Sequence, residues 1–228
     1  MSGILYVVAT PIGNLGDITK RAIETLELVD FVLAEDTRVT HKLLQYINLK
    51  KRVFIYTDHS PPSQEDKIIE ELLSGKSFAL VTDAGTPGIS DPGEKIIDRV
   101  LEAQIQVVPV SGPSAVATLM SVFGKPNPAY HFWGFFPPKQ KKQRELMEYF
   151  DNIPGVHVFF ESPYRVIKTL EKFFIEKDKF HMVIGREMTK MHETYYRGTP
   201  QEAYEKLKQD KVKGEFCIGL VKLKEKKK

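Results

Sequence analysis

A buried apolar run that ends in an acid and a turn-rich loop constrains this chain more than any other feature. Residues 78–81 (Phe-Ala-Leu-Val) are continuously apolar, which is typical of a strand covered on both faces of a parallel sheet. Asp83 follows this run, and the next ten residues include three glycines and two prolines. Ligands of open α/β sheets bind beyond the carboxyl ends of the strands, where glycines let them approach the backbone. We therefore predict that Asp83 contacts a small-molecule ligand.

The second acid of that loop has a structural explanation instead. Asp91 is followed by Pro92, and Glu94 lies three residues beyond Asp91. An acid, a proline at the first helical position and a glutamate at this spacing are typical of a helix N-terminus. We therefore expect Asp91 to cap a helix.

The first half of the chain alternates strand-like and helix-like patterns. An amphipathic helix with Asp17 as its cap would place Ile18, Ala22, Ile23 and Leu26 on one face. This alternation predicts a mainly parallel sheet with helices on both faces. The strand-like runs lie near residues 4–9, 30–34, 53–56, 78–82 and 105–110.

The stretch 124–128 (Gly-Lys-Pro-Asn-Pro) breaks this pattern and is the candidate linker. We expect an N-terminal α/β domain over residues 1–124 and a C-terminal mixed α/β domain over residues 125–228, with a cleft between them. Strands near the end of the chain follow one another directly, which favours a mixed sheet. The expected strands of this half are 131–136, 156–161, 180–186, 193–198 and 214–223, and the expected helices are 140–151, 163–175 and 200–209.

Composition excludes several classes of protein. The 228 residues are 42% hydrophobic and 28% charged, and no apolar run is long enough to span a bilayer. The apolar run 4–9 is too short for a secretory signal, so we expect a cytoplasmic protein without a membrane partner. The single cysteine, Cys217, lies in an apolar run and is expected in the core. It excludes an internal disulfide, and with no clustered histidines we expect no metal.

Basic residues are unevenly placed although the net charge is only +3. We interpret the lysines of the C-terminal tail as solubilising. The basic cluster Lys139, Lys141, Lys142 and Arg144 follows an aromatic stretch (residues 132–136), a combination that suits binding of RNA. The alternative is a solvated helix start, with Glu145 and Glu148 offsetting part of the charge.

Familiar nucleotide-binding and nucleophile signatures are absent: residues 9–16 do not match the dinucleotide-binding glycine pattern, and residues 111–115 do not form a nucleophile elbow. The segment 111–115 (Ser-Gly-Pro-Ser-Ala) predicts a strand-to-helix turn with Pro113 opening the helix. Its backbone N–H groups would suit the carboxylate of an amino-acid-like ligand. Simple N-capping by Ser111 or Ser114 explains it equally well.

Together these segments resemble one family, the ribosomal RNA small subunit methyltransferase I branch of the tetrapyrrole methylase superfamily. Residues 10–14 (Thr-Pro-Ile-Gly-Asn) and 35–38 (Glu-Asp-Thr-Arg) separate this branch from its tetrapyrrole-modifying relatives. The resemblance implies S-adenosylmethionine (SAM) as methyl donor, 2′-O-methylation of a cytidine ribose in the decoding region of 16S rRNA, and a homodimer; DNA is not an expected partner. The matching segments are 5–15, 17–19, 34–38, the Asp83 loop, 111–115, 134–137, 161–165 and 186–190.

The resemblance also assigns candidate residues. The SAM contacts that it implies are Ile12, Asp83, Thr86, Ser114, Ala115 and Phe160, with further contacts near Met188 and Phe216. The branch usually has Asn and Glu after a histidine in the third-strand loop, whereas residues 58–62 here are Asp-His-Ser-Pro-Pro. A contact assigned to that Asn therefore has no matching residue in this chain.

A ribose hydroxyl is a poor nucleophile until its proton is removed, so a base near the substrate should matter. We favour Asp36 as this base, with Arg38 holding phosphate or substrate, while Glu35, Glu161 and Glu187 are also candidates. Glu35, Asp36 and Arg38 would equally well form a structural ion-pair set. Arg165 and Lys190 are further candidates for RNA contact.

Two other functions compete with this one. The first is SAM-dependent methylation of a tetrapyrrole or a modified protein side chain, whose enzymes typically begin with a more glycine-rich first loop. The second is a non-catalytic ribosome assembly factor that kept the fold, against which the Asp83 loop and the turn at residues 111–115 argue.

Overall fold

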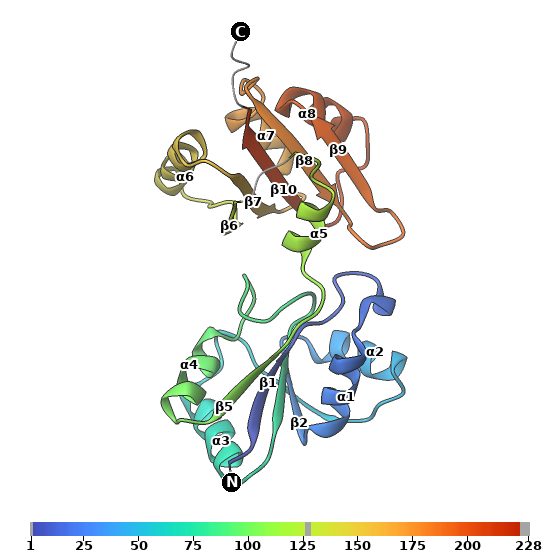
Figure 1. Ribbon diagram of the computed structural model, residues 1–228, viewed down its shortest axis with the longest axis vertical. Helices are drawn as coiled ribbons and strands as arrows, with labels where there is room; N and C mark the ends of the chain where they lie inside the picture. The colour runs from blue at the N-terminus through green and yellow to red at the C-terminus, as the bar shows by residue number, and fades with distance from the viewer. Residues whose placement is uncertain (1, 126–128, 224–228) are drawn as a thin grey trace. The chain divides into compact units, whose positions relative to one another are not determined.

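The computed structural model describes residues 2–125 and 129–223, and it divides into two compact units, Met1–Ser114 and Ala115–Lys228 (Figure 1). The central residues of the expected linker, 126–128, and most of the lysine tail lie outside the described residues.

The first unit is built on a five-stranded, entirely parallel sheet, which confirms the prediction from the alternating pattern. The strand order is β3-β2-β4-β1-β5, so β4 and β1 lie side by side at the centre. The strands are β1 (Ile4–Val8), β2 (Phe31–Ala34), β3 (Arg52–Ile55), β4 (Phe78–Val81) and β5 (Gln106–Val110). The helices are η1 (Leu15–Asp17), α1 (Lys20–Leu28), α2 (Thr37–Tyr46), α3 (Pro62–Leu73) and α4 (Glu94–Glu102).

Helices cover both faces of this sheet, because its central strands are apolar on both sides. On one face, Ile68 of α3 and Ile96 of α4 pack against Leu5 and Leu80. On the other face, Leu26 of α1 packs in a second cluster that includes Val8 and Val81. All four residues of β4 are buried, as the continuous apolar run predicts.

The helix starts differ from those expected. Thr19, not Asp17, caps α1, and its hydroxyl accepts a hydrogen bond from Ala22 N at 3.1 Å. Helix α4 begins at Glu94 after Gly93, so the expected cap by Asp91 is wrong. Gly93 has φ +144°, and a Cβ there would lie 3.0 Å from the side chain of Leu80, so the chain turns at a residue that needs glycine. Likewise, α5 begins at Ala115, two residues beyond Pro113.

The second unit has a mixed five-stranded sheet of order β6-β7-β10-β8-β9, in which β6 and β7 are parallel and the other pairs antiparallel. This confirms the predicted mixed half. Its strands are β6 (Tyr130–Phe135), β7 (Val156–Glu161), β8 (Phe180–Arg186), β9 (Thr194–Gly198) and β10 (Phe216–Lys222). Its helices are α5 (Ala115–Ser121), α6 (Gln140–Asn152), α7 (Val166–Phe173) and α8 (Pro200–Lys208).

The two faces of this sheet bury separate clusters. One holds side chains of α6, α7 and α8, such as Phe150, Leu170 and Leu207. The other holds Leu119 of α5 and Phe123. A Cβ on Gly219 of β10 would lie 2.8 Å from the ring of Phe123, so a glycine lets this segment approach the sheet closely.

This packing moves the boundary between the units to Ser114 and Ala115, ten residues before the expected boundary at 124. Helix α5 belongs to the second unit because its apolar side chains pack on that unit's sheet.

Cys217 is buried in the same cluster as α5, as expected, and burial raises the pKa of its thiol. In the described part of the chain, no helix has both the length and the apolar character required to cross a membrane.

Candidate functional site

The loops that follow the strands of the first sheet are tied together at its carboxyl edge. Thr10, after β1, and Gly85, after β4, exchange two backbone hydrogen bonds of 2.8 and 3.1 Å. The hydroxyl of Thr10 also donates to the carbonyl of Thr82 at 3.0 Å. Gly85 has φ +91°, a backbone conformation that glycine adopts without strain. The loop after β4 is therefore held in one shape before any ligand arrives.

Asp83 lies where the sequence placed it, at the end of β4 on this edge. Its Oδ1 accepts a hydrogen bond from the backbone N–H of Asp36 at 3.1 Å, which joins the loops after β4 and β2. The side chain is half-buried, and burial together with the neighbouring Asp36 carboxylate raises the pKa of Asp83. The hydrogen bond occupies one carboxylate oxygen and orients the group.

The other expected SAM contacts of the first unit surround the same loop. Ile12 lies beside Gly85, since a Cβ built on that glycine would be 3.6 Å from Ile12 Cγ2. Thr86 donates from its hydroxyl to the carbonyl of Pro113 at 3.4 Å, which brings the loop that carries Ser114 next to the Asp83 loop. The structure thus collects Ile12, Asp83, Thr86 and Ser114 at one edge of one sheet.

A small cavity of about 40 Å³ opens beside Asp83. Its walls come from three loops or helices, and α2 supplies one side of it with Val39, Thr40 and Leu43. Sequence reasoning gave no role to Thr10 or Thr82, which also line this cavity. A threonine at the end of each of two adjacent central strands was the available signal for them.

Asp36 and Arg38 form a local structural set, one of the two interpretations left open by the sequence. Asp36 is the N-cap of α2, and its Oδ1 accepts from the backbone N–H of Arg38 at 2.8 Å. The Arg38 guanidinium pairs with the same carboxylate at 2.6 Å. These hydrogen bonds to Arg38 lower the pKa of Asp36 to about 2. A carboxylate of such low pKa is a weak proton acceptor at neutral pH.

Glu35 has the opposite electrostatic environment. It is half-buried at the end of β2, and burial, followed by the charges of Asp83, Asp58 and Asp36, raises the pKa of its carboxyl. A carboxylate whose pKa is raised binds a proton more readily than Asp36 does.

The remaining expected SAM contacts lie in the second unit. Ala115, Phe160 and Met188 pack in one cluster on the face of the sheet that α5 covers. A Cβ on Gly185 would lie 2.6 Å from Met188 Sδ, so this glycine makes room for the methionine. The side chain of Phe216 belongs to the cluster on the opposite face, so it packs away from the other three.

Glu161 is buried and fully engaged with neighbouring groups. Its carboxylate accepts from Ser162 N and from the Thr169 hydroxyl, both at 2.7 Å, and pairs with Arg165 at 2.6 Å. Arg165 also donates to the carbonyl of Phe136 at 3.1 Å. These contacts join β7, α7 and the end of β6, so Glu161 and Arg165 stabilise the packing of these elements.

Glu187 and Lys190 are likewise paired with each other, at 2.9 Å. Lys190 also pairs with Glu215 at 3.2 Å, and Glu187 accepts from the backbone N–H of Glu215 at 2.9 Å. Glu187 has φ +51°, a backbone conformation that this network stabilises.

The basic cluster Lys139, Lys141, Lys142 and Arg144 lies on the first turns of α6, and all four side chains are exposed. Lys139 is the N-cap and makes no side-chain capping hydrogen bond. Cations at a helix N-terminus oppose the helix dipole, and the first backbone N–H groups of a helix have no intrahelical acceptor. This end of α6 therefore concentrates positive charge and hydrogen-bond donors at the surface.

Among the residues that the structure describes, no group of three or more His, Cys, Asp or Glu side chains is arranged to hold a metal ion.

Comparison with known proteins identifies the class. The family of tetrapyrrole (corrin/porphyrin) methylases matches residues 4–204. The fold is similar to that of diphthine synthase, with a TM-score of 0.75, 14% identity, and coverage of 98% of this chain and 90% of that one. It is also similar to cobalt precorrin-4 methyltransferase, with a TM-score of 0.70, 16% identity, and coverage of 96% and 94%.

Sequence relatives narrow the class to a branch. The chain is 39% identical over 216 residues to the ribosomal RNA small subunit methyltransferase I of Halalkalibacterium halodurans, covering 95% of this chain and 75% of that protein. It is 42% identical over 192 residues to the protein of the same name from Vibrio cholerae, covering 84% and 67%. The chain belongs to the tetrapyrrole methylase family and, within it, to the branch of ribosomal RNA small subunit methyltransferase I.

Proposed function

We propose that this protein transfers a methyl group from SAM to the 2′-hydroxyl of a cytidine in the decoding region of 16S rRNA. The observation that carries the proposal is the 39% identity, over 95% of the chain, to a relative named for methylation of small-subunit rRNA. The polar carboxyl edge of the first sheet and the basic cluster on α6 are compatible with this chemistry.

The donor site would be formed by loops that the structure already holds in place. Asp83 and the turn at residues 111–115 lie at the same edge, tied by the hydrogen bond between Thr86 and Pro113. A half-buried carboxylate suits the hydroxyl or ammonium groups of SAM, and backbone N–H groups at a strand-to-helix turn suit its carboxylate. When bound, SAM supplies a methyl group already activated on a sulfonium. Ala115, Phe160 and Met188, which share one cluster of the second unit, are the further SAM contacts that we propose from the family resemblance.

We propose Glu35 as the proton acceptor. Burial and the charge of Asp83 raise the pKa of Glu35, whereas Asp36 caps α2 and pairs with Arg38. Glu161 and Glu187 are each held by several hydrogen bonds. We therefore assign removal of the ribose proton to Glu35, and to Asp36 and Arg38 the positioning of the start of α2.

The basic cluster on α6 would bind the phosphates of the RNA. Four exposed cations at the positive end of a helix destabilise that helix slightly, and a bound polyanion removes this penalty. Arg165 is paired with Glu161 and Lys190 with Glu187. Each cation would therefore bind an RNA phosphate only while it also contacts its carboxylate. We further propose, from the family resemblance, that the protein is a cytoplasmic homodimer.

Incubation with labelled SAM and three alternative acceptors tests the function. The acceptors are small ribosomal subunits that lack the methyl group, naked 16S rRNA and a porphyrinoid. Label on the subunits or rRNA supports the proposal, whereas label only on the porphyrinoid rejects it. Binding to subunits without any methyl transfer or SAM binding would favour an assembly factor.

A further inference from the structure

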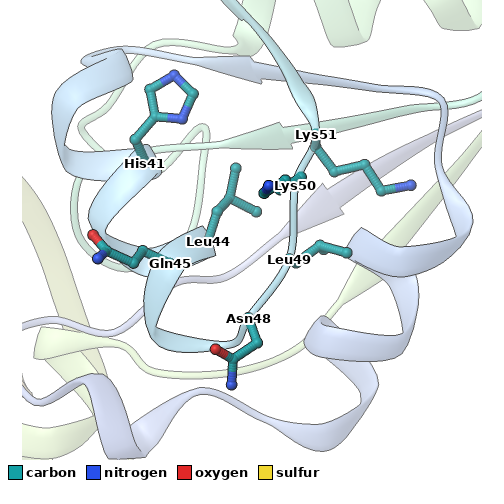
Figure 2. A pocket seen from close by; sticks show the side chains of 7 residues that line it. All are labelled: His41, Leu44, Gln45, Asn48, Leu49, Lys50 and Lys51. Carbon is teal, nitrogen blue, oxygen red and sulfur yellow. The ribbon is translucent and has the colours of Figure 1, made fainter.

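A second and larger cavity, of about 400 Å³, lies on the first unit between α2 and the segment that leads to β3 (Figure 2). It has no part in the donor site described above. It is lined by His41, Leu44, Gln45, Asn48, Leu49, Lys50 and Lys51.

The lining combines an apolar floor with polar groups at the rim. Leu44 is buried and Leu49 is half-buried, while His41, Gln45 and Asn48 are exposed. An imidazole can stack on the face of a planar heterocycle. The two amides can hydrogen-bond to its edge, because an amide offers both donors and an acceptor. A floor of aliphatic carbon with amides at its rim suits a nucleobase better than it suits a sugar or a simple anion.

The segment that forms the cavity carries basic residues, one of which, Arg38, is paired with Asp36. Residues 37–57 include five Lys and Arg residues and no Asp or Glu. No acidic residue lines the cavity. A lining with two lysines and no acid favours binding of a phosphate group.

The two lysines of the lining, Lys50 and Lys51, have different surroundings. Lys51 donates to the carbonyls of Glu27 at 2.7 Å and Val29 at 2.5 Å, so its ammonium holds the end of α1. Figure 2 shows Lys51 directed away from α2, whereas the ammonium of Lys50 lies on the side of the segment that faces α2. Lys50 is exposed and is therefore the lysine placed to pair with a phosphate at the rim.

The shape of the cavity is set by the end of α2. Asn48 has φ +54°, and its neighbours close the helix with hydrogen bonds from Asn48 N to Gln45 O and from Leu49 N to Leu44 O. This left-handed turn is a common helix end, so it explains the backbone but leaves the amide of Asn48 available at the rim. The same helix lines the small cavity beside Asp83 with Thr40 and Leu43, so α2 separates the two cavities.

We propose that this cavity binds one unpaired nucleotide of the RNA substrate, with its base on Leu44 and Leu49 and its phosphate at Lys50. The proposal rests on the proposed function, because it names a contact of the same substrate. A nucleotide held here and a ligand in the small cavity beside Asp83 would both contact α2, each through its own cavity. The cavity would then contribute to choosing which unpaired segment reaches the donor site.

The test uses the whole protein and a short, fluorescent single-stranded RNA, alone and in competition with cytidine monophosphate or inorganic phosphate. Three variants remove one group each: Gln45→Ala, Lys50→Ala and Asn48→Gly, the last of which keeps the left-handed turn free of strain. Each should weaken RNA binding about tenfold, in line with the loss of one base or phosphate contact. Lys67→Ala, at an exposed lysine of α3 on the opposite face of the sheet, is the matched control and should bind like the wild type.

Two further arms separate the outcomes. An RNA with one abasic position should bind more weakly than the intact strand, and a photoreactive pyrimidine should crosslink to residues 41–51. Equal binding of intact and abasic strands, or a crosslink elsewhere only, overturns the base pocket. Competition by phosphate as strong as that by the nucleotide would do the same. These measurements need no methyl transfer. The nucleotide-binding proposal can therefore be refuted while methylation of the subunits is observed, and it can be supported while methylation is not observed.

Discussion

Asp83→Asn separates the contribution of Asp83 to ligand binding from its contribution to the fold. The substitution keeps the size of the side chain and an oxygen that can accept from the backbone N–H of Asp36, the 3.1 Å hydrogen bond that joins two loops. It removes the charge and the second carboxylate oxygen. A single hydrogen bond to a charged group contributes about 1.5–3 kcal/mol, so the Kd for SAM should rise roughly 10- to 150-fold.

The same variant should not destabilise the protein at neutral pH. Burial and Asp36 raise the pKa of Asp83 in the folded state, so ionisation of this carboxyl costs stability as the pH rises above its unfolded pKa. Removing the charge should therefore leave the melting temperature at pH 8 equal to or above that of the wild type. The two proteins should converge near pH 3, where the carboxyl is protonated in both states.

Isothermal titration calorimetry with SAM and thermal unfolding between pH 3 and pH 8 measure the two effects. Asp98→Asn, an exposed acid on α4, is the matched control and should change neither quantity. Unchanged SAM affinity in folded Asp83→Asn would remove Asp83 from the donor site. A melting temperature that falls at pH 8 would refute the electrostatic reasoning.

Three other changes test separate parts of the account. Glu35→Gln should slow methyl transfer in single-turnover assays by about 10²–10⁴-fold, with little change in SAM affinity. Asp36→Asn, which keeps an N-cap, should slow transfer far less, and the reverse order would make Asp36 the base. Another change neutralises the whole basic cluster on α6. The slope of log binding constant against log salt concentration for subunit binding should fall in magnitude by roughly 0.7–0.9 per lost contact, and thermal stability should not fall. Binding equal to that of the wild type at every salt concentration would mark the cluster as a solvated helix start. Glu161→Gln should lower the free energy of unfolding in urea titrations by about 1–3 kcal/mol, because Arg165 loses its charged partner. The control Glu145→Gln, at an exposed residue of α6, should have little effect. An unchanged urea midpoint for Glu161→Gln would show that the Glu161 contacts add no stability.

The strands were predictable because each has a local signal. The continuous run Phe78–Val81 is buried at all four positions, and β8 begins and ends at the residues expected from the sequence. The end of β4 also fixed the location of Asp83, since the carboxyl ends of parallel strands share one edge. Its partner, the backbone N–H of Asp36, lies 47 residues away and follows only from the strand order.

The helix starts were less predictable, because neighbouring residues offered equally good caps. Asp17 and Thr19 are both favoured N-cap types, and the choice of Thr19 depends on where η1 ends. At α4, the approach of Gly93 to Leu80 overrides the local pattern around Asp91. The domain boundary was misplaced for a similar reason: a glycine- and proline-rich stretch is visible locally, whereas the packing of Phe123 on Gly219 is not.

At the candidate site, the acidic residues were predictable from the sequence, but the directions of their pKa shifts were not. Glu35 and Asp36 are adjacent in the chain, yet burial raises the pKa of one and Arg38 lowers that of the other. The cavity at the end of α2 had no motif at all, because it arises from the way a helix end and the following segment pack.

The position of the transferred methyl group tests the central claim most directly. Small subunits lacking the modification are incubated with the protein and SAM, and the rRNA is digested to nucleosides and analysed by mass spectrometry. We expect 2′-O-methylcytidine from one site in the decoding region, formed far more slowly when Glu35→Gln replaces the wild type. Methyl groups found on a base, or on no RNA nucleoside while a porphyrinoid is methylated, would contradict it.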